Sequence, residues 1–319
     1  MSIDLGRLGL GCAQLGNLYA AIDHTAAAET VAAAWDAGIR YFDTAPHYGL
    51  GLSERRLGAA LTGRPRAAYA VSTKVGRLLV PDPAGAARPD PDGFVVPADH
   101  RRVWDFTADG VRRSLDDSLA RLKLDRVDLV LLHDPEDHAR PALDEAYPTL
   151  HALRAQGVIR AVGVGSKQTA VLTRFARDTD VDVLMVAGRY TLLEQPALDA
   201  LLPAALDRGV AVLNAGVFNS GILAADNPTP DSRYEYTPAP PSLVRRAEAI
   251  AAICARHGTT LPAAALAFAA AHPAVTTVVA GAQTPTQVRQ NSAAPHPPPA
   301  LWADLRAAGL LRPDAPTPT

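Results

Sequence analysis

The sequence predicts an α/β fold, a single-domain (β/α)8 TIM barrel with long loops after its strands, and three observations support this. The length of 319 residues fits one barrel of about 250 residues with extensions, although it would equally allow two domains of about 150 residues. Hydrophobic residues make up 48% and charged residues 20% of the chain, as expected for an ordinary buried core. Short β-rich runs alternate with amphipathic Ala/Leu-rich runs, which indicates a parallel sheet because parallel strands need crossover connections.

Eight strand–helix units follow one another along the chain, which indicates a closed barrel. The predicted strands are Leu8–Cys12, Arg40–Phe42, Ala70–Ser72, Val127–Leu132, Ile159–Val164, Val183–Val186, Val210–Leu213 and Thr277–Val279. The predicted helices are Thr25–Ala37, Ser53–Leu61, Thr107–Leu122, Leu143–Gln156, Thr169–Asp178, Gln195–Asp207, Pro241–Arg256 and Pro285–Ala294. Suitable helix-boundary residues accompany them, with Thr25 and Thr107 as N-caps and glycines 38, 157, 209 and 258 at helix ends.

Two segments show neither a helix nor a strand period. Residues Gly76–Asp105 follow the third strand directly, and a long loop in this position is usually a binding loop or lid. Residues Asp226–Pro240 form a second, Pro-rich interruption. The barrel domain is predicted over residues 1–312, and residues 313–319 are expected to be a mobile tail because PDAPTPT has little apolar surface to bury.

Composition limits the classes of function. The net charge is −2, from 31 basic and 33 acidic residues, which argues against a nucleic-acid partner because such proteins need a basic surface. No apolar run suggests a signal peptide or a membrane span. The two cysteines, Cys12 and Cys254, do not form a disulfide framework and indicate a reducing compartment, expected to be the cytoplasm. Nothing in the sequence indicates an oligomeric state.

Four polar residues stand at or just beyond the ends of successive predicted strands. Asp43, Lys74 and His133 end the second, third and fourth strands, and Tyr48 follows on the loop after Asp43. Because the carboxyl ends of barrel strands converge on one mouth, these side chains are expected to meet. Each alone has a structural interpretation, as a cap, a rim aromatic, an ion pair or a core histidine. Their occurrence together favours catalysis.

Together these residues would form a site in which neighbouring groups alter the pKa of the Tyr48 phenol. A free tyrosine has a pKa near ~10, and the charge of Lys74 is expected to lower the pKa of Tyr48. Asp43 would hold Lys74 in place, and His133 would orient a substrate oxygen. The phenol would then give or take a proton at a carbonyl or hydroxyl carbon.

Two other kinds of site find no support in the sequence. There is no HExxH motif or Cys/His cluster, so no metal site is predicted. His47, Asp134 and His138 could bind a metal together, but their spacing matches no established metal-binding motif. No GxGxxG motif follows a strand, so a Rossmann nucleotide site is not predicted.

Motifs between Leu8 and Asn291 resemble those of the aldo-keto reductase family. They are LGLG (Leu8–Gly11), FDTAPHYG (Phe42–Gly49), GLSERRLG (Gly51–Gly58), STKVG (Ser72–Gly76), RSLDDSLARLKLDRVDLVLLHD (Arg113–Asp134), GVIRAVGVG (Gly157–Gly165) and GAQTPTQVRQN (Gly281–Asn291). The resemblance implies metal-free hydride transfer between a nicotinamide nucleotide and a carbonyl or alcohol. It also implies that Asp43, Tyr48, Lys74 and His133 form the catalytic tetrad.

Further motifs resemble one group within the family, the L-fucose dehydrogenase or D-threo-aldose 1-dehydrogenase group. They are AGRYTLL (Ala187–Leu193), NAGVFNSGILA (Asn214–Ala224), STKVGRLL and HDPEDH. This resemblance implies oxidation of the anomeric carbon of an aldose to a lactone. The alternatives are a pyridoxal 4-dehydrogenase or a general aldehyde reductase, and, in another class, a nucleotide-binding regulatory subunit, against which the intact tetrad argues.

The resemblance also implies where an extended dinucleotide would bind. The nicotinamide would lie near Gly11, Cys12 and Asp43, with Ser166, or its neighbours Lys167 and Gln168, replacing the Asn that the family usually carries after the GVG turn. The pyrophosphate would meet Gly216, Val217, Phe218, Asn219 and Ser220. The adenosine would meet Gly281, Ala282, Gln283, Thr284, Gln287, Gln290 and Asn291, a segment that also suits an ordinary helix start.

The neutral adenosine segment favours NAD over NADP, which remains the alternative. Many NADP-using relatives have Arg where Gln287 stands, and a 2′-phosphate favours a charged partner. The substrate is expected to be a small sugar or aldehyde, under a lid formed by Gly76–Asp105. Its predicted contacts are His47, Tyr48, Trp104 and His133, although Trp104 would serve equally as an anchor for its own loop.

Overall fold

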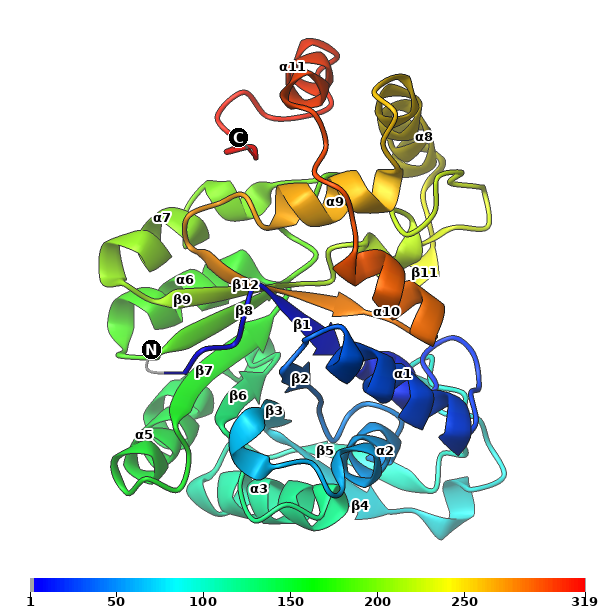
Figure 1. Cartoon of the computed structure of the whole chain (residues 1–319). Coiled ribbons are helices and arrows are strands. Elements are labelled where there is room, and N and C mark those ends of the chain that lie inside the picture. The colour runs from blue at the N-terminus through cyan, green and yellow to red at the C-terminus, as the bar shows by residue number, and fades with distance from the viewer. Residues whose placement is uncertain (1–2, 319) are drawn as a thin grey trace.

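The computed structural model of the protein, described for residues 3–318, confirms the predicted barrel. Strand β1 pairs with both β12 and β2, and these pairings close the ring seen in Figure 1. The strand order around the ring is β1 (Leu8–Gly11), β12 (Val275–Gly281), β9 (Ala211–Ala215), β8 (Val183–Ala187), β7 (Ala161–Ser166), β6 (Leu129–His133), β3 (Ala70–Val75) and β2 (Tyr41–Asp43).

The helices surround the barrel (Figure 1). Those that lie where the sequence predicts them are α1 (His24–Asp36), α2 (Leu52–Leu61), α3 (Ala108–Leu122), α5 (Tyr147–Ala155), α6 (Thr169–Asp178), α7 (Leu201–Arg208), α8 (Pro241–Arg256) and α10 (Pro285–Ser292). Three further helices were not predicted from the sequence, namely α4 (Ala139–Pro141), α9 (Leu261–Ala269) and α11 (Pro299–Ala307). Nearly all residues of helix α9 are buried, and the helix is apolar on every side. Its sequence therefore shows no amphipathic period.

The helix boundaries agree with the sequence at most of the predicted positions. Thr107 accepts a hydrogen bond from the backbone N–H of Gly110 at 3.1 Å, so its role as N-cap is confirmed. The prediction for Thr25 is wrong, because Asp23 caps α1 by accepting from Ala26 N at 2.7 Å. The glycines at positions 38, 157, 209 and 258 all have positive φ, as helix-ending glycines require.

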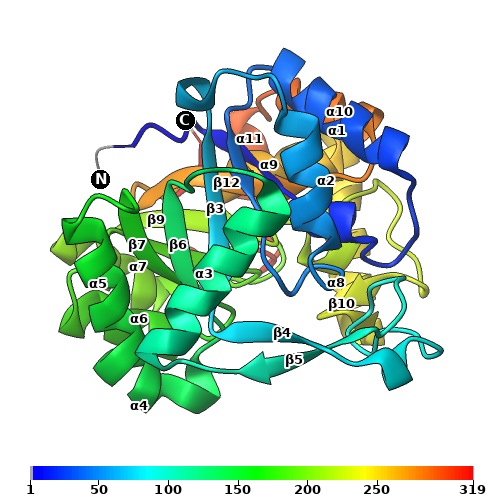
Figure 2. The same ribbon diagram turned by 90° about the horizontal axis from the view of Figure 1, so that it is seen from below.

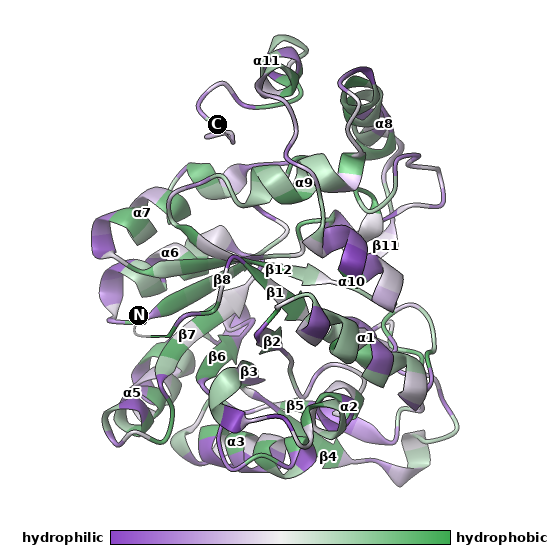
Figure 3. Ribbon diagram, viewed as in Figure 1, coloured by the Kyte–Doolittle hydropathy of each residue, from purple (hydrophilic) through white to green (hydrophobic). Residues whose placement is uncertain are grey.

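Alternation along each strand divides the core into two layers. On β6, Leu129 and Leu131 belong to the cluster inside the barrel, whereas Val130 and Leu132 pack outward against the helices. Figure 3 shows these strands as a largely hydrophobic centre. A strand that is buried on both faces is a nearly continuous apolar run, and therefore the polar residues at its end are conspicuous in the sequence.

Two antiparallel hairpins replace segments that the sequence predicted to be irregular. Strands β4 (Arg77–Pro81) and β5 (His100–Trp104) pair within the segment 76–105, below β3 in Figure 2. Strands β10 (Arg233–Tyr234) and β11 (Thr237–Pro238) pair within the segment 226–240. The prediction that 76–105 contains no strand is wrong, because β4 and β5 pair with each other outside the barrel. The sequence did not reveal them because they lack the apolar pattern of the barrel strands.

The carboxyl-terminal segment contacts the body of the protein. Ala315 is buried, and Arg306 donates hydrogen bonds to the carbonyl of Ala315 at 2.8 Å and to Thr317 at 3.2 Å. The mobility of 313–319 stays a prediction; Thr319 lies outside the described residues, as do positions 1 and 2 of the predicted domain. Over residues 3–318, no helix is long and apolar enough to cross a membrane.

Candidate active site

The four predicted catalytic side chains meet at the carboxyl end of the barrel. Lys74 Nζ lies 2.9 and 2.7 Å from the two carboxylate oxygens of Asp43. The same ammonium lies 3.1 Å from the Tyr48 hydroxyl. His133 completes the group, with its ring centroid 6.0 Å from that of Tyr48. Lys74 therefore joins the carboxylate to the phenol, and both charged groups are almost fully buried.

Neighbouring strands hold the carboxylate of Asp43. Ser72, on β3, donates a hydrogen bond to Asp43 Oδ1 at 2.7 Å. The Ser72 hydroxyl is in turn 2.8 Å from the hydroxyl of Tyr41 on β2. Tyr41 and Asp43 are two residues apart on one strand, so both point into the barrel. The parallel register of β2 and β3 thus fixes the acid that holds the lysine.

The electrostatics of the phenol differ from the sequence-based expectation. Burial raises the pKa of Tyr48, and the positive charge of Lys74 offsets this only in part. The expected net lowering is therefore wrong, because loss of water disfavours the phenolate and Asp43 balances the lysine charge. Burial also opposes the charged form of Lys74, but Asp43 outweighs it, and the pKa of Lys74 is raised.

Two neutral imidazoles flank the phenol. Burial lowers the pKa of His47 and of His133, and the charge of Arg77 lowers both further. The ring centroids of the two histidines lie 5.6 Å apart. A neutral imidazole has one N–H donor and one acceptor nitrogen. His47 Nδ1 faces the Arg77 guanidinium at 3.3 Å and must accept, so His47 can donate to a substrate hydroxyl from Nε2, whereas His133 can donate or accept.

A cavity of about 1270 Å³ extends from this cluster across the mouth of the barrel. It exceeds the roughly 300–1,000 Å³ of common ligand pockets, as a dinucleotide and a substrate together require. Within residues 3–318, Thr284 and Trp104 are the predicted site residues outside its lining. The predicted cofactor residues in its lining are Gly11, Cys12, Asp43, Ser166, Gly216, Val217, Phe218, Asn219, Ser220, Gly281, Ala282, Gln283, Gln287, Gln290 and Asn291.

The loop after β9 contains three residues in the left-handed region of backbone conformation, as anion-binding turns often do. Gly216, Asn219 and Ser220 have φ values of 62°, 44° and 60°, and turns with such residues direct backbone N–H groups to one side. Asn219 Oδ1 and Gln14 Oε1 are buried acceptors without a partner within residues 3–318. Both residues line the cavity. Because buried acceptors normally have partners, this donor and acceptor set fits a polar nucleotide.

The adenosine end of the predicted site is formed by the start of α10. Thr284 accepts from Gln287 N at 3.2 Å, and Gln287 Oε1 accepts from Gln283 N at 2.7 Å. Gln287 therefore stabilises the helix start while it lines the cavity. Arg289 is outside the lining, and Asp226 is within it. Among the described residues, the lining cations come from the loops after β3, β7 and β8 and from β3 itself, not from this end.

Ser166 makes two contacts with the protein. Its hydroxyl donates to Glu136 at 2.9 Å and accepts from Gln168 N at 2.9 Å. Lys167, the next residue, has its ammonium 4.4 Å from the centre of the Tyr236 ring. The predicted contact between Ser166 and the nicotinamide carboxamide stays a prediction, and Lys167 points to a residue of the cavity wall.

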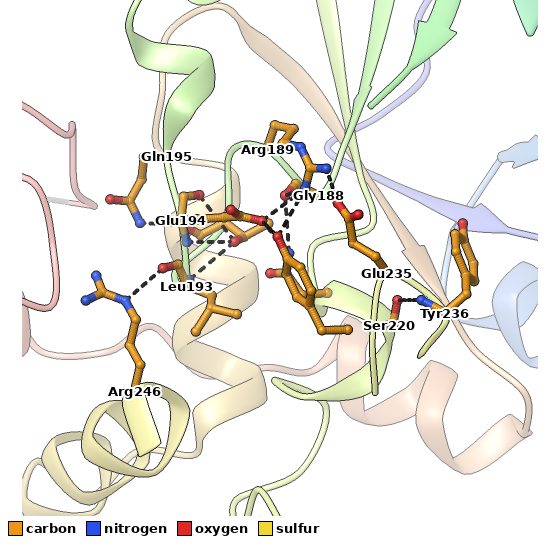
Figure 4. A network of polar contacts seen from close by, with 12 residues as sticks. Gly188, Arg189, Leu193, Glu194, Gln195, Ser220, Glu235, Tyr236 and Arg246 are labelled. Carbon is orange, nitrogen blue, oxygen red and sulfur yellow. Dashed lines mark hydrogen bonds and ion pairs between the residues drawn. The ribbon is translucent and has the colours of Figure 1, made fainter. Parts of the chain in front are cut away.

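The β10–β11 hairpin forms part of that wall and is held by polar contacts (Figure 4). Arg189 pairs with Glu235 on the hairpin turn and with Glu194 at 3.1 Å. Tyr236 N donates to Ser220 Oγ at 3.1 Å. The hairpin is thereby fixed to the loop after β9. Tyr236 was not predicted as a lining residue, since a hairpin of two-residue strands has no detectable period in the sequence.

The β4–β5 hairpin brings two arginines to the catalytic end. Arg102 donates to the carbonyl of His47 at 2.9 Å and pairs with Asp90. Arg77 contacts His47 Nδ1 at 3.3 Å. The Arg77 guanidinium lies 4.3 Å from the ring centre of Trp104, which is 43% exposed and outside the cavity lining. The structure thus places Trp104 as a support of its own hairpin.

Comparisons with known proteins agree with this geometry. The sequence model of the Aldo/keto reductase family matches residues 7–298. A D-threo-aldose 1-dehydrogenase from a Pseudomonas species is 51% identical, over 98% of this chain and 95% of that protein. A pyridoxal 4-dehydrogenase from Microbacterium luteolum is 37% identical, over 95% and 94%. An aldo-keto reductase from Bacillus halodurans, in its holo form, aligns with a TM-score of 0.74 at 27% identity, over 96% and 92%.

Proposed function

Because the chain belongs to the aldo/keto reductase family, a family of nicotinamide-dependent oxidoreductases, we propose that it oxidises the anomeric hydroxyl of an aldose to a lactone, with NAD as its cofactor. The observation that carries the proposal is the contact of Lys74 with both Asp43 and Tyr48 at one end of the large cavity. The similarity to D-threo-aldose 1-dehydrogenase over nearly the full length supports the aldose as substrate.

The chain supplies the proton acceptor and its surroundings. The Tyr48 phenolate accepts the proton of the anomeric hydroxyl, and the Lys74 ammonium, 3.1 Å from the phenol oxygen, stabilises the phenolate. Asp43 keeps that ammonium charged and in place. Neutral His133 donates a hydrogen bond to the same substrate oxygen. The bound nicotinamide supplies the acceptor for the hydride that leaves the anomeric carbon.

The residues that would hold the cofactor follow the cavity. Gly11, Cys12 and Asp43 would contact the nicotinamide end, and Ser166 would contact its carboxamide. The loop from Gly216 to Ser220 would hold the pyrophosphate through backbone N–H groups. The segment Gly281–Thr284 with Gln287, Gln290 and Asn291 would hold the adenosine. The neutral residues Gln287, Gln290 and Asn291 in the lining support NAD, because a 2′-phosphate favours a charged partner.

A substrate panel tests the proposal. Production of NADH or NADPH should be followed with L-fucose, D-arabinose and pyridoxal, and consumption of NADH or NADPH with a simple aliphatic aldehyde. We expect kcat/KM to be highest for an aldose with NAD. Faster oxidation of pyridoxal would favour the activity named for the 37% identical relative. Tight nucleotide binding without turnover of any compound would favour a regulatory subunit.

A further inference from the structure

The carboxylate next to the catalytic histidine is held in an uncommon backbone conformation. Strand β6 ends at His133, and Asp134 follows with a φ of 44°, in the left-handed region that few residues other than glycine adopt. Its N–H donates to the carbonyl of Gly165 at 2.9 Å, which ties the turn to β7. The turn places Asp134 in the cavity lining, with Oδ2 3.7 Å from His133 Nε2.

Arg77 fixes the direction of this carboxylate. Its guanidinium forms an ion pair with Asp134 Oδ2, contacts His47 Nδ1 at 3.3 Å and lies over Trp104. Only 13% of the Arg77 side chain is exposed. An arginine with contacts on several sides has little freedom, so the carboxylate that it holds is already oriented before a substrate binds.

One oxygen of Asp134 is available to a ligand. Within residues 3–318, Oδ1 has no hydrogen-bond partner, while Oδ2 is occupied by Arg77. The Asp134 side chain is 31% exposed, and the residue lines the cavity beside His133 and Tyr48. An ionised carboxylate only accepts hydrogen bonds. This free oxygen therefore matches a hydroxyl group of a substrate bound against the catalytic phenol.

We propose that Asp134, held by Arg77, accepts a hydrogen bond from the hydroxyl on the carbon next to the reacting carbon, and so selects sugars that carry a hydroxyl at C2. The proposal rests on the proposed aldose oxidation. His133 would bind the oxygen at C1 through Nε2. Asp134 Oδ2 lies 3.7 Å from this nitrogen. The substituent on the neighbouring carbon is thus the one that reaches Asp134. A simple aldehyde has no such group.

The test measures kcat/KM with NAD for an aldose that the wild type oxidises, called the parent sugar, and for its 2-deoxy and 3-deoxy forms. Each sugar is tested with the wild type and with Asp134→Asn. Asparagine has the same shape and tolerates the left-handed conformation. A hydrogen bond to a charged group is worth about 10- to 100-fold in kcat/KM. We expect the wild type to disfavour the 2-deoxy sugar by this factor. In Asp134→Asn, kcat/KM for the parent sugar should fall by most of this factor, whereas kcat/KM for the 2-deoxy sugar should change little.

The matched control is Asp137→Asn, which removes the same charge from an exposed residue of the same loop that is outside the cavity lining. It should keep the wild-type preference. Arg77→Lys is the second variant, used if Asp134→Asn does not fold, and should weaken discrimination at C2 with nucleotide Kd unchanged.

Three results would overturn the assignment of Asp134. The first is an equal loss of kcat/KM for the parent and the 2-deoxy sugar in Asp134→Asn. The second is a wild type that disfavours the 3-deoxy sugar but not the 2-deoxy sugar. The third is the same loss of preference in Asp137→Asn as in Asp134→Asn. If the wild type oxidises no aldose at all, the proposed function itself falls, and with it this assignment. Oxidation of aldoses without preference at C2 overturns only the assignment.

Discussion

The two ends of the cavity are built from different chemistry. At the catalytic end, strands β2 and β3 bring a buried ammonium to a buried carboxylate, with the Lys74–Asp43 ion pair at 2.7 Å. At the other end, where we propose that the adenosine binds and which we call the adenosine end, the start of α10 presents the neutral side chains of Gln287, Gln290 and Asn291. The first end rests on strands inside the barrel, and the second on a helix at its rim.

This difference predicts how each end responds to substitution. Removal of one member of a buried ion pair leaves an uncompensated charge in a dry site, which is very costly. Exchange of one neutral hydrogen-bonding group at a rim costs much less. The catalytic end therefore has little freedom in residue type, whereas the adenosine end can change its preferred nucleotide by a single substitution.

Tyr48→Phe should remove most turnover and leave nucleotide binding nearly intact. Loss of a general acid–base group costs on the order of 10²–10⁴-fold in rate, and the phenol touches Lys74 rather than the adenosine end. Steady-state kcat and a fluorescence titration of nucleotide Kd measure the two effects. A variant that keeps more than about a tenth of the wild-type kcat would show that Tyr48 does not transfer the proton.

Lys74→Met should destabilise the fold by roughly 3–5 kcal/mol, because it leaves Asp43 buried and unpaired. Urea unfolding at neutral pH gives the free energy of unfolding. The control is the double variant Asp43→Asn with Lys74→Met, which has no uncompensated charge and should recover part of the loss. If the double variant is less stable than the single one, the ion pair is not the source of the effect.

Oxidation should speed up as the pH rises from neutral into the alkaline range. Burial raises the pKa of Tyr48, so the Tyr48 phenol is protonated in most protein molecules at neutral pH. Only the phenolate form of Tyr48 can accept the substrate proton. Below that pKa, kcat/KM should rise about tenfold per pH unit, whereas reduction, which needs the protonated phenol, should not rise. Rate profiles in both directions provide the measurement. A rate of oxidation that is already constant at neutral pH would contradict the raised pKa, and one that falls with rising pH would contradict Tyr48 as the proton acceptor.

Gln287→Arg should shift preference from NAD towards NADP by about 10- to 100-fold in kcat/KM, the value of one charge-assisted hydrogen bond. Kinetics with both nucleotides in both proteins provide the measurement. Arg289→Gln is the matched control, since Arg289 lies outside the cavity lining, and it should leave the ratio unchanged. A wild type that already prefers NADP would show that an arginine from another segment reaches the phosphate.

Trp104→Ala should have the smallest effect, because among residues 3–318 Arg77 is the contact that connects Trp104 to the cavity. A cation–π contact at an exposed site is worth about 0.5–1 kcal/mol, or about 2- to 5-fold. We expect KM for the sugar to rise by this factor while nucleotide Kd stays the same. A much larger rise would restore Trp104 as a direct sugar contact.

Much of the fold could be predicted because barrel strands are buried on both faces. Runs such as Leu129–Leu132 are continuous in apolar character, so Asp43, Lys74 and His133 stand out where the strands end. The positions of these ends also predicted that the side chains meet, since parallel strands of a barrel all point to one mouth. Helix α9 was missed for the opposite reason, since a helix that is apolar all round has no period.

Local patterns and strand order were enough to predict the barrel, the meeting of Asp43, Tyr48, Lys74 and His133, and the neutral residues at the start of α10. The direction of the shift in the pKa of Tyr48 came from the three-dimensional arrangement, because it depends on how burial compares with the charges of Lys74 and Asp43. The same arrangement also placed Arg77 against Asp134, and Trp104 outside the cavity. Such contacts join segments far apart in the chain through side-chain directions, and no periodicity records those directions.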